Sequence, residues 1–257
     1  MSDMPHRTPT TDTIAYRAKV AVVVPATNTV VQPEMEAMRP PGVTNHVTRM
    51  LLPPRPYEDQ VAYKKALETE EGNLEDALRL ALACEPHVVA HGHSIHSFRG
   101  DGQRAIDEEK RLEALCGIPF ITPSRALLAG LEAIGNPKRI AILTPYWEPA
   151  NDMIDKFFTS CGYDVVASHG LQSTGPTVVA RFTAEQIMQG FEAVDRPQAD
   201  ALIHVGTNLP VSSMTPAIEK KFGKPLIGVN VATYWLALRR LGIGDKLPGM
   251  GLLGEQY

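Results

Sequence analysis

The chain repeats itself once, and this repeat limits the folds that it can adopt. Three pairs of segments match, in the same order along the chain: KVAVVVPATN (19–28) with RIAILTPYWEPAN (139–151), HVVAHGHS (87–94) with ALIHVGTN (201–208), and GIPFITPSRALLAGLEAIG (117–135) with GKPLIGVNVATYWLALRRLG (223–242). Such ordered self-similarity is the mark of a duplicated unit. We therefore expect two similar halves, at about 19–135 and 138–245.

Each half alternates continuous apolar strands with helical patterns, which is typical of an α/β fold with parallel sheets covered on both faces. Ligands of such sheets bind beyond the carboxyl ends of the strands. The repeated polar motifs all follow strands, so we expect the two halves to face each other across a cleft that holds one small ligand. The predicted boundaries are a flexible tail at 1–17, a first half at 18–136 and a second half at 137–257.

Local patterns predict several individual elements. Residues 44–52 read as a second strand, and residues 57–83 as a long amphipathic helix that bends near Gly72 and Asn73. A T-x-x-Q capping box at Thr183 opens a helix in the second half. Ser124 is expected to cap a helix that stops at Gly135.

The net charge of −4 gives no electrostatic reason to expect nucleic acid or an anionic membrane as partner. No apolar run approaches the ~20 residues that span a bilayer. The polar N-terminus resembles no signal peptide, and the three cysteines have no metal-site spacing, so we expect a cytoplasmic protein with structural thiols at Cys84, Cys116 and Cys161. Homo-oligomers are common among such proteins and are expected here.

The loop that follows the first strand, Pro25 to Thr29, lacks the glycine patterns of dinucleotide and nucleoside triphosphate sites, so no cofactor is expected. The hydroxyl of Thr27, the amide of Asn28 and the backbone N–H groups can hold a carboxylate at a helix N-terminus. The alternative is a plain capping turn. In the matching loop of the second half, Tyr146 can donate a hydrogen bond to an oxyanion. The alternative is that its ring only packs between the two halves. The neighbouring Trp147 is expected to pack.

The segment VVAHGHSIHSFRG, residues 88–100, is rich in histidine. His91 and His93 point to one side if the strand extends that far, but no carboxylate or thiol completes a metal site, and none is expected. His93 lies past the apolar part of the strand, where acid–base work is plausible. His96, His91 and His204 are weaker candidates, and His87 is expected at the strand start.

Two further features complete the candidate site. Arg99 can pair with a substrate carboxylate or take part in an ion pair between the halves. The second half offers Gly206, Thr207 and Asn208 at its equivalent strand end, where glycine lets a ligand approach the backbone.

As a set, these segments resemble the aspartate/glutamate racemase superfamily, especially its maleate isomerase and arylmalonate decarboxylase branch. The resemblance covers about residues 19–242 and rests on these segments: VVVPATNTVVQPEME, GHSIHSFRG, LTPYWEPAN, LIHVGTNLP and IPFITPSRALLAGLEAIG. It implies two pseudo-symmetric halves, each a four-stranded parallel sheet flanked by helices, with the site between them. It also implies chemistry that makes or quenches a carbanion or enolate beside a carboxylate.

The resemblance implies cysteines at the two strand ends: racemases use both, the isomerase uses one of the pair as nucleophile, and the decarboxylase keeps only the second as proton donor, with glycine in the first place. Here the matching positions are Gly92 and Gly206 or, one residue on, His93 and Thr207, so neither register supplies a thiol. The resemblance carries over the anion-binding frame of Asn28, Ser94 and Tyr146. His93 then takes over proton transfer, and the glycines at 92 and 206 are expected to enlarge the pocket for a bulkier substrate.

The leading hypothesis is a cofactor-free lyase, decarboxylase or isomerase that acts on a small carboxylate or carbonyl acid through an enolate-like state. Two alternatives remain at this point. One is a hydrolase of a cyclic amide or lactone, with water activated by His93 or His96. The other is a carboxylate-binding protein without catalytic activity.

Overall fold

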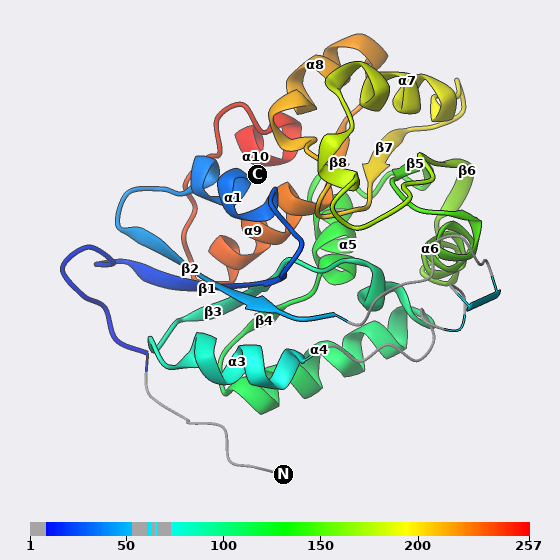
Figure 1. Cartoon of the computed structure of the whole chain (residues 1–257). Helices are drawn as coiled ribbons and strands as arrows, with labels where there is room; N and C mark the ends of the chain where they lie inside the picture. Colours follow the sequence, from blue (N-terminus) through cyan, green and yellow to red (C-terminus); the bar gives the residue numbers. More distant parts are fainter. Residues whose placement is uncertain (1–8, 53–60, 63–64, 66–72) are drawn as a thin grey trace.

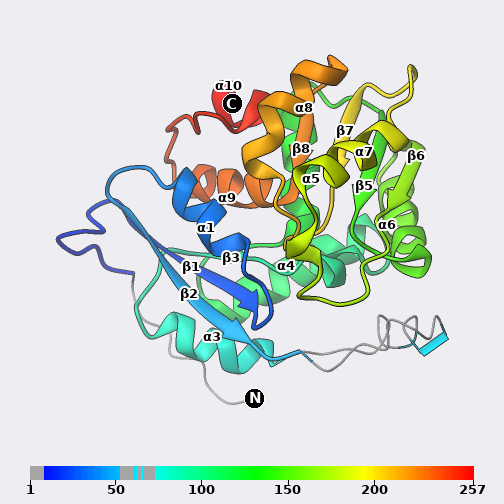
Figure 2. The same cartoon turned by 45° about the horizontal axis from the view of Figure 1, so that its top comes forward.

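The computed structural model describes residues 9–52, 61–62, 65 and 73–257. It contains two four-stranded sheets with the same strand order, β2-β1-β3-β4 and β6-β5-β7-β8, and every strand pairing is parallel. Figures 1 and 2 show the two sheets side by side, with α9 and α5 between them. The predicted fold, two similar four-stranded α/β halves, is thus confirmed.

The strands have these bounds: β1 Ala18–Pro25, β2 Val43–Met50, β3 Val88–His91, β4 Phe120–Ile121, β5 Arg139–Thr144, β6 Asp164–Gly170, β7 Ala201–His204 and β8 Leu226–Gly228. The helices are α1 Val31–Met38, α3 Leu74–Leu82, α4 Gly102–Cys116, α5 Pro123–Ala133, α6 Glu148–Ser160, α7 Ala184–Val194, α8 Thr215–Phe222, α9 Val229–Arg240 and α10 Gly251–Gln256. Short 3₁₀ turns occur at η1 Ile95–Phe98, η2 Val179–Arg181 and η3 Ser212–Met214.

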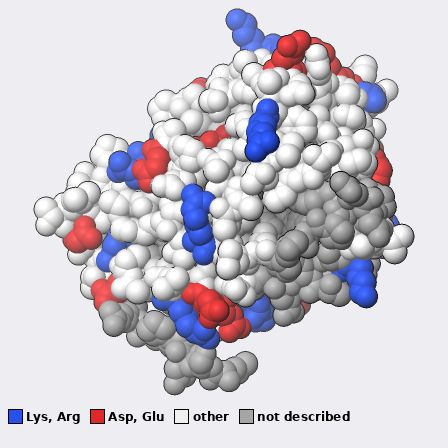
Figure 3. All heavy atoms as spheres, in the orientation of Figure 1, with Lys and Arg blue, Asp and Glu red and all other residues white. Residues whose placement is uncertain are grey.

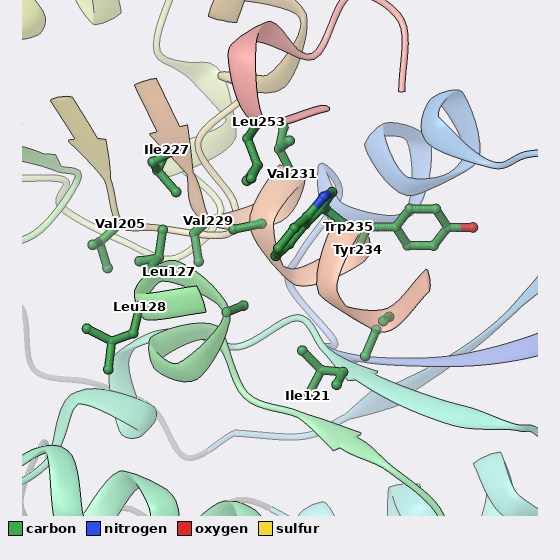
Figure 4. Packing of buried hydrophobic residues seen from close by; sticks show 14 of the residues in the cluster. Ile121, Leu127, Leu128, Val205, Ile227, Val229, Val231, Tyr234, Trp235 and Leu253 are labelled. Atoms are coloured by element: carbon green, nitrogen blue, oxygen red, sulfur yellow. The ribbon is translucent and has the colours of Figure 1, made fainter. Parts of the chain in front are cut away.

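The largest apolar cluster joins the two halves. Buried side chains of both sheets, α1, α5, α6 and α9 belong to it, and Figure 4 shows Leu127 of α5 and Trp235 of α9 among its members. Across the halves, Phe98 of η1 packs edge-on against Phe157 of α6, with ring centroids 5.2 Å apart. Burial of this kind stabilises by roughly 25 cal/mol per Å² of apolar surface. The shared core fixes how the two strand edges face each other.

Each sheet also has an outer layer. On the first sheet, Leu78 and Leu112 of α3 and α4 pack against alternate strand residues such as Val23 and Phe120. On the second sheet, α7 and α8 supply the corresponding cover, with Phe191 and Ile218. Strand residues alternate between the shared core and these outer layers, as the period of two requires.

Two local predictions have different outcomes at helix starts. The capping box at Thr183 is present: its hydroxyl accepts the N–H of Gln186, and the Gln186 side chain accepts the N–H of Thr183. The prediction for Ser124 is wrong. The α5 helix begins at Pro123 after an extended Thr122, because proline suits the first helical position, where no N–H is needed. The helix ends at Ala133 with Ile134 as its C-cap, and the predicted stop residue Gly135 follows with φ of +99°.

Residues 10 to 17, within the segment predicted as a tail, contact the rest of the protein. Thr10 donates a hydrogen bond to Glu85, Ala15 is fully buried, and Arg17 forms a bidentate pair with Asp245 near the C-terminus. The segment therefore adds contacts to both halves before β1 starts. Strand β2 agrees with the predicted 44–52. The first part of the helix predicted at 57–83 lies largely outside the described residues, and α3 forms its end.

The face in Figure 3 is largely uncharged, and its lysines, arginines and carboxylates occur in small mixed groups. Among the described residues, no helix is long and apolar enough to cross a membrane.

Candidate active site

A cavity of about 440 Å³ opens at the carboxyl ends of the strands, between the two halves. We call it the cleft. The described residues that line it are Pro25, Ala26, Thr27, Asn28, Leu51, Leu52, His93, Pro145, Tyr146, Thr174, Gly175, Pro176, Val179, Gly206, Thr207 and Asn208. Its position is the one expected for a ligand site in parallel α/β sheets.

Strand register shows which residues of the two halves are equivalent. In the first sheet His91 ends β3 and pairs with Val23, and in the second sheet His204 ends β7 and pairs with Leu143. His93 and Gly206 each follow two residues later, so they occupy the same position in the duplicated fold. This corrects the sequence alignment of the repeat, which matched Gly92 with Gly206. At this position one half presents a buried imidazole to the cleft and the other half presents no side chain.

Gly206 has no room for a side chain. Its φ is +140°, and an added Cβ would lie 2.4 Å from Cδ of Pro145. We predict that Gly206→Ala lowers the free energy of unfolding by about 2–4 kcal/mol, because backbone strain and overpacking add. Urea denaturation measures this change. Gly244→Ala is the control, since no described atom lies within 4 Å of its added Cβ; equal losses in both variants would contradict the prediction.

Gly92 has a different role from the one predicted. An added Cβ there would lie 2.7 Å from Val24 and 3.0 Å from Val31, in the shared core, so the absent side chain does not enlarge the cleft. The carbonyl of Gly92 instead accepts a hydrogen bond of 2.9 Å from the hydroxyl of Thr207. Gly92 therefore packs β3 against the start of α1 and ties the two halves together.

Tyr146 is held in place by its own loop. The hydroxyl of Thr144 accepts the N–H of Tyr146 at 3.0 Å and donates to Asn151 at 2.5 Å. Gly170 of β6 lets this loop approach, because a Cβ there would meet the Tyr146 carbonyl at 2.1 Å. These contacts account for the spacing of Thr144, Tyr146 and Asn151 in the segment LTPYWEPAN. The neighbouring Trp147 packs as predicted, with its Nε1–H donated to the carbonyl of Ser173.

The hydroxyls of Ser94 and Tyr146 lie 2.9 Å apart, one from each half. Ser94 is fully buried beside His93, and Tyr146 lines the cleft. Either hydroxyl can be the donor of this bond. Predicted oxyanion groups 52 residues apart in sequence are therefore brought together.

Asn28 acts as a cap as well as a wall of the cleft. Its Oδ1 accepts the N–H groups of Val30 and Val31 at the start of α1, at 3.0 and 2.9 Å. Its Nδ2 lies 3.3 Å from the hydroxyl of Thr207. Asn28 therefore makes the capping turn that the sequence suggested and also lines the cleft.

Asn208 links the loops of the two halves. Its Oδ1 accepts the N–H of Thr29 at 2.9 Å, and its Nδ2 donates to the carbonyl of Pro176 at 2.8 Å. The carbonyl of Thr27 lies 3.5 Å from the same nitrogen. Thr27, Thr207 and Asn208 all line the cleft, where we expected them.

Arg99 does not join the other predicted residues. It lines a second cavity, together with His91 and His96, on the side of the first sheet that α3 and α4 cover. His93 lines both cavities; its ring centroid lies 4.7 Å from that of His96 and 6.0 Å from that of His91. The 3₁₀ turn η1, Ile95–Phe98, lies between His93 and Arg99 and carries the chain away from the cleft, which explains this placement of Arg99.

The cysteines stand apart from the cleft. Cys84 follows α3, Cys116 ends α4 and Cys161 caps α6, and none of them is among its lining residues. Burial raises the pKa of each thiol, to about 12 for Cys116, so these groups stay protonated near neutral pH. Within the described residues, no group of three His, Cys, Asp or Glu side chains has an arrangement that could hold a metal ion.

One part of the cleft wall and one contact between the halves lie outside the predicted residues. The segment after β6 supplies Thr174, Pro176 and Val179 to the wall, and its run of Ser, Thr, Gly and Pro was the available signal. The contact between the halves is made by Glu34 of α1, which is not among the residues that line the cleft. It accepts hydrogen bonds from Ser212 and Asn230 of the other half, at 2.6 Å each, and the sequence carries no sign of this pairing.

The two matching sheets and the cavity at their carboxyl ends define a duplicated α/β protein with a cleft between its halves. Comparison with known proteins agrees. The sequence profile of the arylmalonate decarboxylase family matches residues 20–253, and the chain belongs to that family. A maleate isomerase of Nocardia farcinica is 26% identical over 249 residues, which cover 93% of this chain and 96% of that protein. The arylmalonate decarboxylase of Bordetella bronchiseptica is 28% identical over 191 residues, with coverage of 72% and 78%.

Solved structures show the same likeness. A variant of the Nocardia farcinica maleate cis-trans isomerase with a covalently bound succinylcysteine intermediate superposes with a TM-score of 0.81 at 23% identity, and covers 93% of this chain and 98% of that one. Unliganded arylmalonate decarboxylase gives a TM-score of 0.74 at 24% identity, with coverage of 93% and 99%. At these identities the match establishes the shared fold.

Proposed function

We propose that the chain is a cofactor-free enzyme that acts on a small carboxylate or carbonyl acid through an enolate-like intermediate, by decarboxylation or isomerisation. The observation that carries the proposal is the arrangement of His93, Tyr146 and Ser94: the buried imidazole of His93 and the phenol of Tyr146 both line the cleft, and the Tyr146 hydroxyl shares a 2.9 Å hydrogen bond with the buried hydroxyl of Ser94. Family membership supports the class, because the matched relatives are named as isomerases and decarboxylases.

The proposed reaction needs two groups from the protein. When a malonate-type substrate loses carbon dioxide, the electron pair of the broken bond moves onto the α-carbon and into the remaining carboxylate. Tyr146 donates a hydrogen bond to that carboxylate as its charge grows, and Ser94 donates to the Tyr146 oxygen from behind. Protonated His93 then delivers its proton to the carbon and becomes neutral. Imidazole suits this step because its ordinary pKa of about 6.5 is near the working pH.

The cleft also favours the build-up of negative charge. Asn28 and Thr207 are held by hydrogen bonds from both halves, so their polar groups are already oriented before the substrate arrives. Preorganised dipoles of this kind stabilise a transition state without reorganisation. Leu51, Leu52, Pro145 and Val179 add apolar walls that suit a hydrocarbon substituent.

Tyr146→Phe tests the oxyanion role. We expect kcat to fall roughly 10²–10³-fold, because the substitution removes one donor to the growing charge and keeps the ring. Steady-state kinetics on the substrate identified below measure this. Tyr163→Phe is the matched control, since it removes a hydroxyl that donates to Asn136 outside the cleft. An equal fall in both variants would show a general effect on folding rather than an oxyanion contact.

The direct test of the function is to incubate the protein with phenylmalonate and maleate in heavy water and to follow products by NMR. Loss of carbon dioxide with deuterium at the α-carbon, or conversion of maleate to its trans isomer, supports the proposal. Hydantoin and lactone probes belong in the same screen, since ring opening would identify a hydrolase. Tight binding of these acids without turnover would identify a binding protein.

A further inference from the structure

The second cavity holds about 400 Å³ and lies against the outer face of the first sheet, between α3 and α4. Only His93 and Leu52, among the described residues, line both this cavity and the cleft. The catalytic proposal uses only the face of His93 that looks into the cleft. The second cavity therefore adjoins the proposed site and has no role in it so far.

Charged side chains gather around this cavity. Its described lining includes three arginines, Arg99, Arg104 and Arg111, and two carboxylates, Glu75 and Glu108. These side chains together carry one net positive charge. Both carboxylates already have cationic neighbours. Glu108 forms a two-point hydrogen bond with Arg111, at 2.8 Å for each contact, and Glu75 lies 3.7 Å from an arginine outside the cavity. This balance suits a ligand with a single negative charge.

His91 provides a second, independent sign of a ligand. Its side chain is 6% exposed and lines the cavity, and its Nε2 has no hydrogen-bond partner among the described residues. It lies on the face of the sheet that carries Phe120, with ring centroids 5.6 Å apart. Buried polar atoms in native proteins usually have a partner, so an unpartnered ring nitrogen in a cavity wall offers a hydrogen bond to whatever occupies the cavity.

We propose that the second cavity binds a carboxylate group, which accepts hydrogen bonds from Arg99 and Arg104 and from Nε2 of His91. Guanidinium groups recognise carboxylates through paired donors, and a neutral imidazole supplies one further N–H. The carboxylate can belong to a separate small acid, or it can be the distal acid group of a substrate whose reacting end lies in the cleft. In both cases this carboxylate lies on the opposite side of His93 from the reacting carbon.

The test measures binding without turnover, so it stands even if the catalytic proposal fails. Benzoate and inorganic phosphate are titrated into the full chain at fixed ionic strength by calorimetry, and the ring signals of His91 are followed by NMR. We expect benzoate to bind, to shift the His91 signals and to bind roughly tenfold or more weakly to Arg99→Gln and Arg104→Gln. Phosphate, with more charge than the lining matches, is expected to bind more weakly than benzoate.

Lys110→Gln is the matched control, because it removes a positive charge from an exposed position of the same helix that lines neither cavity. Unchanged affinity in that variant supports the site. Equal weakening in Lys110→Gln and Arg104→Gln, absence of any His91 response, or tighter binding of phosphate would overturn the proposal.

A competition experiment distinguishes the two sources of the carboxylate. If benzoate still binds while phenylmalonate saturates the cleft, the cavity takes a separate acid. If a phenylmalonate with a second carboxylate on its ring has a lower KM than phenylmalonate, and Arg104→Gln removes that advantage, the cavity takes the distal group of the substrate. If neither result is obtained while benzoate also fails to bind, the site does not exist.

Discussion

His93→Gln is expected to lower kcat roughly 10²–10⁴-fold, which is the usual contribution of a positioned general acid or base. His93 is the one side chain that the duplicated fold presents at the equivalent strand-end positions, since Gly206 stands at the other. It is 7% exposed and lines the cleft beside Tyr146. Glutamine keeps a polar side chain there but cannot carry the proton. Single-turnover kinetics, with deuterium transfer followed by NMR, measure the chemical step directly.

His96→Gln is the control for this experiment. The ring centroid of His96 lies only 4.7 Å from that of His93, but His96 lines the second cavity and not the cleft. We expect that variant to keep most of its activity on phenylmalonate or maleate. A large loss in His96→Gln together with near-native turnover in His93→Gln would move the proton-transfer role to His96, and would favour the alternative in which that histidine activates water.

Much of the fold followed from the sequence because a duplication makes two weak patterns confirm each other. The polar ends of the strands could be located from where apolar runs stop, so Tyr146 and Thr207 were placed at the correct edge of the sheet. Parallel packing then brings such edges together whatever the sequence distance between them. Ser94 and Tyr146 met for this reason, although no local pattern connects them.

The errors arose where a single residue of register matters. The matching of Gly92 with Gly206 was off by one position, because short apolar strands align almost equally well in two registers and only the backbone ladder distinguishes them. Arg99 was assigned to the cleft because it follows the histidines in sequence, but the turn η1 takes it to the other side of His93. Glu34 was missed because its partners come from the opposite half.

The register also reveals a property that the two halves share. His91 and His204 occupy the same position at the ends of β3 and β7, both almost completely buried, and Nε2 of each has no described partner. Burial lowers the pKa of both imidazoles to about 3, since a low-dielectric surrounding disfavours the charged form. In the unfolded chain the same groups titrate near 6.5. The folded state therefore excludes two protons that the unfolded state takes up.

Acid is consequently expected to destabilise the protein well above the pH range of ordinary carboxylates. Stability from these groups is complete above about pH 6.5 and is lost as the pH falls from there toward 3, because the unfolded state binds more protons throughout that window. At about pH 4.5 each imidazole lowers the free energy of unfolding by roughly 2–3 kcal/mol, and the pair lowers it by about 5 kcal/mol.

Urea denaturation of the wild type and of His204→Gln, at about pH 7 and 4.5, measures this loss of stability. Asp155, whose pKa burial raises to about 6, opposes it in both proteins and cancels in the comparison. Between the two pH values, the part of the loss in free energy of unfolding that comes from the two imidazoles should be about half as large in the variant as in the wild type. If both proteins lose the same amount, His204 does not exclude its proton in the folded state.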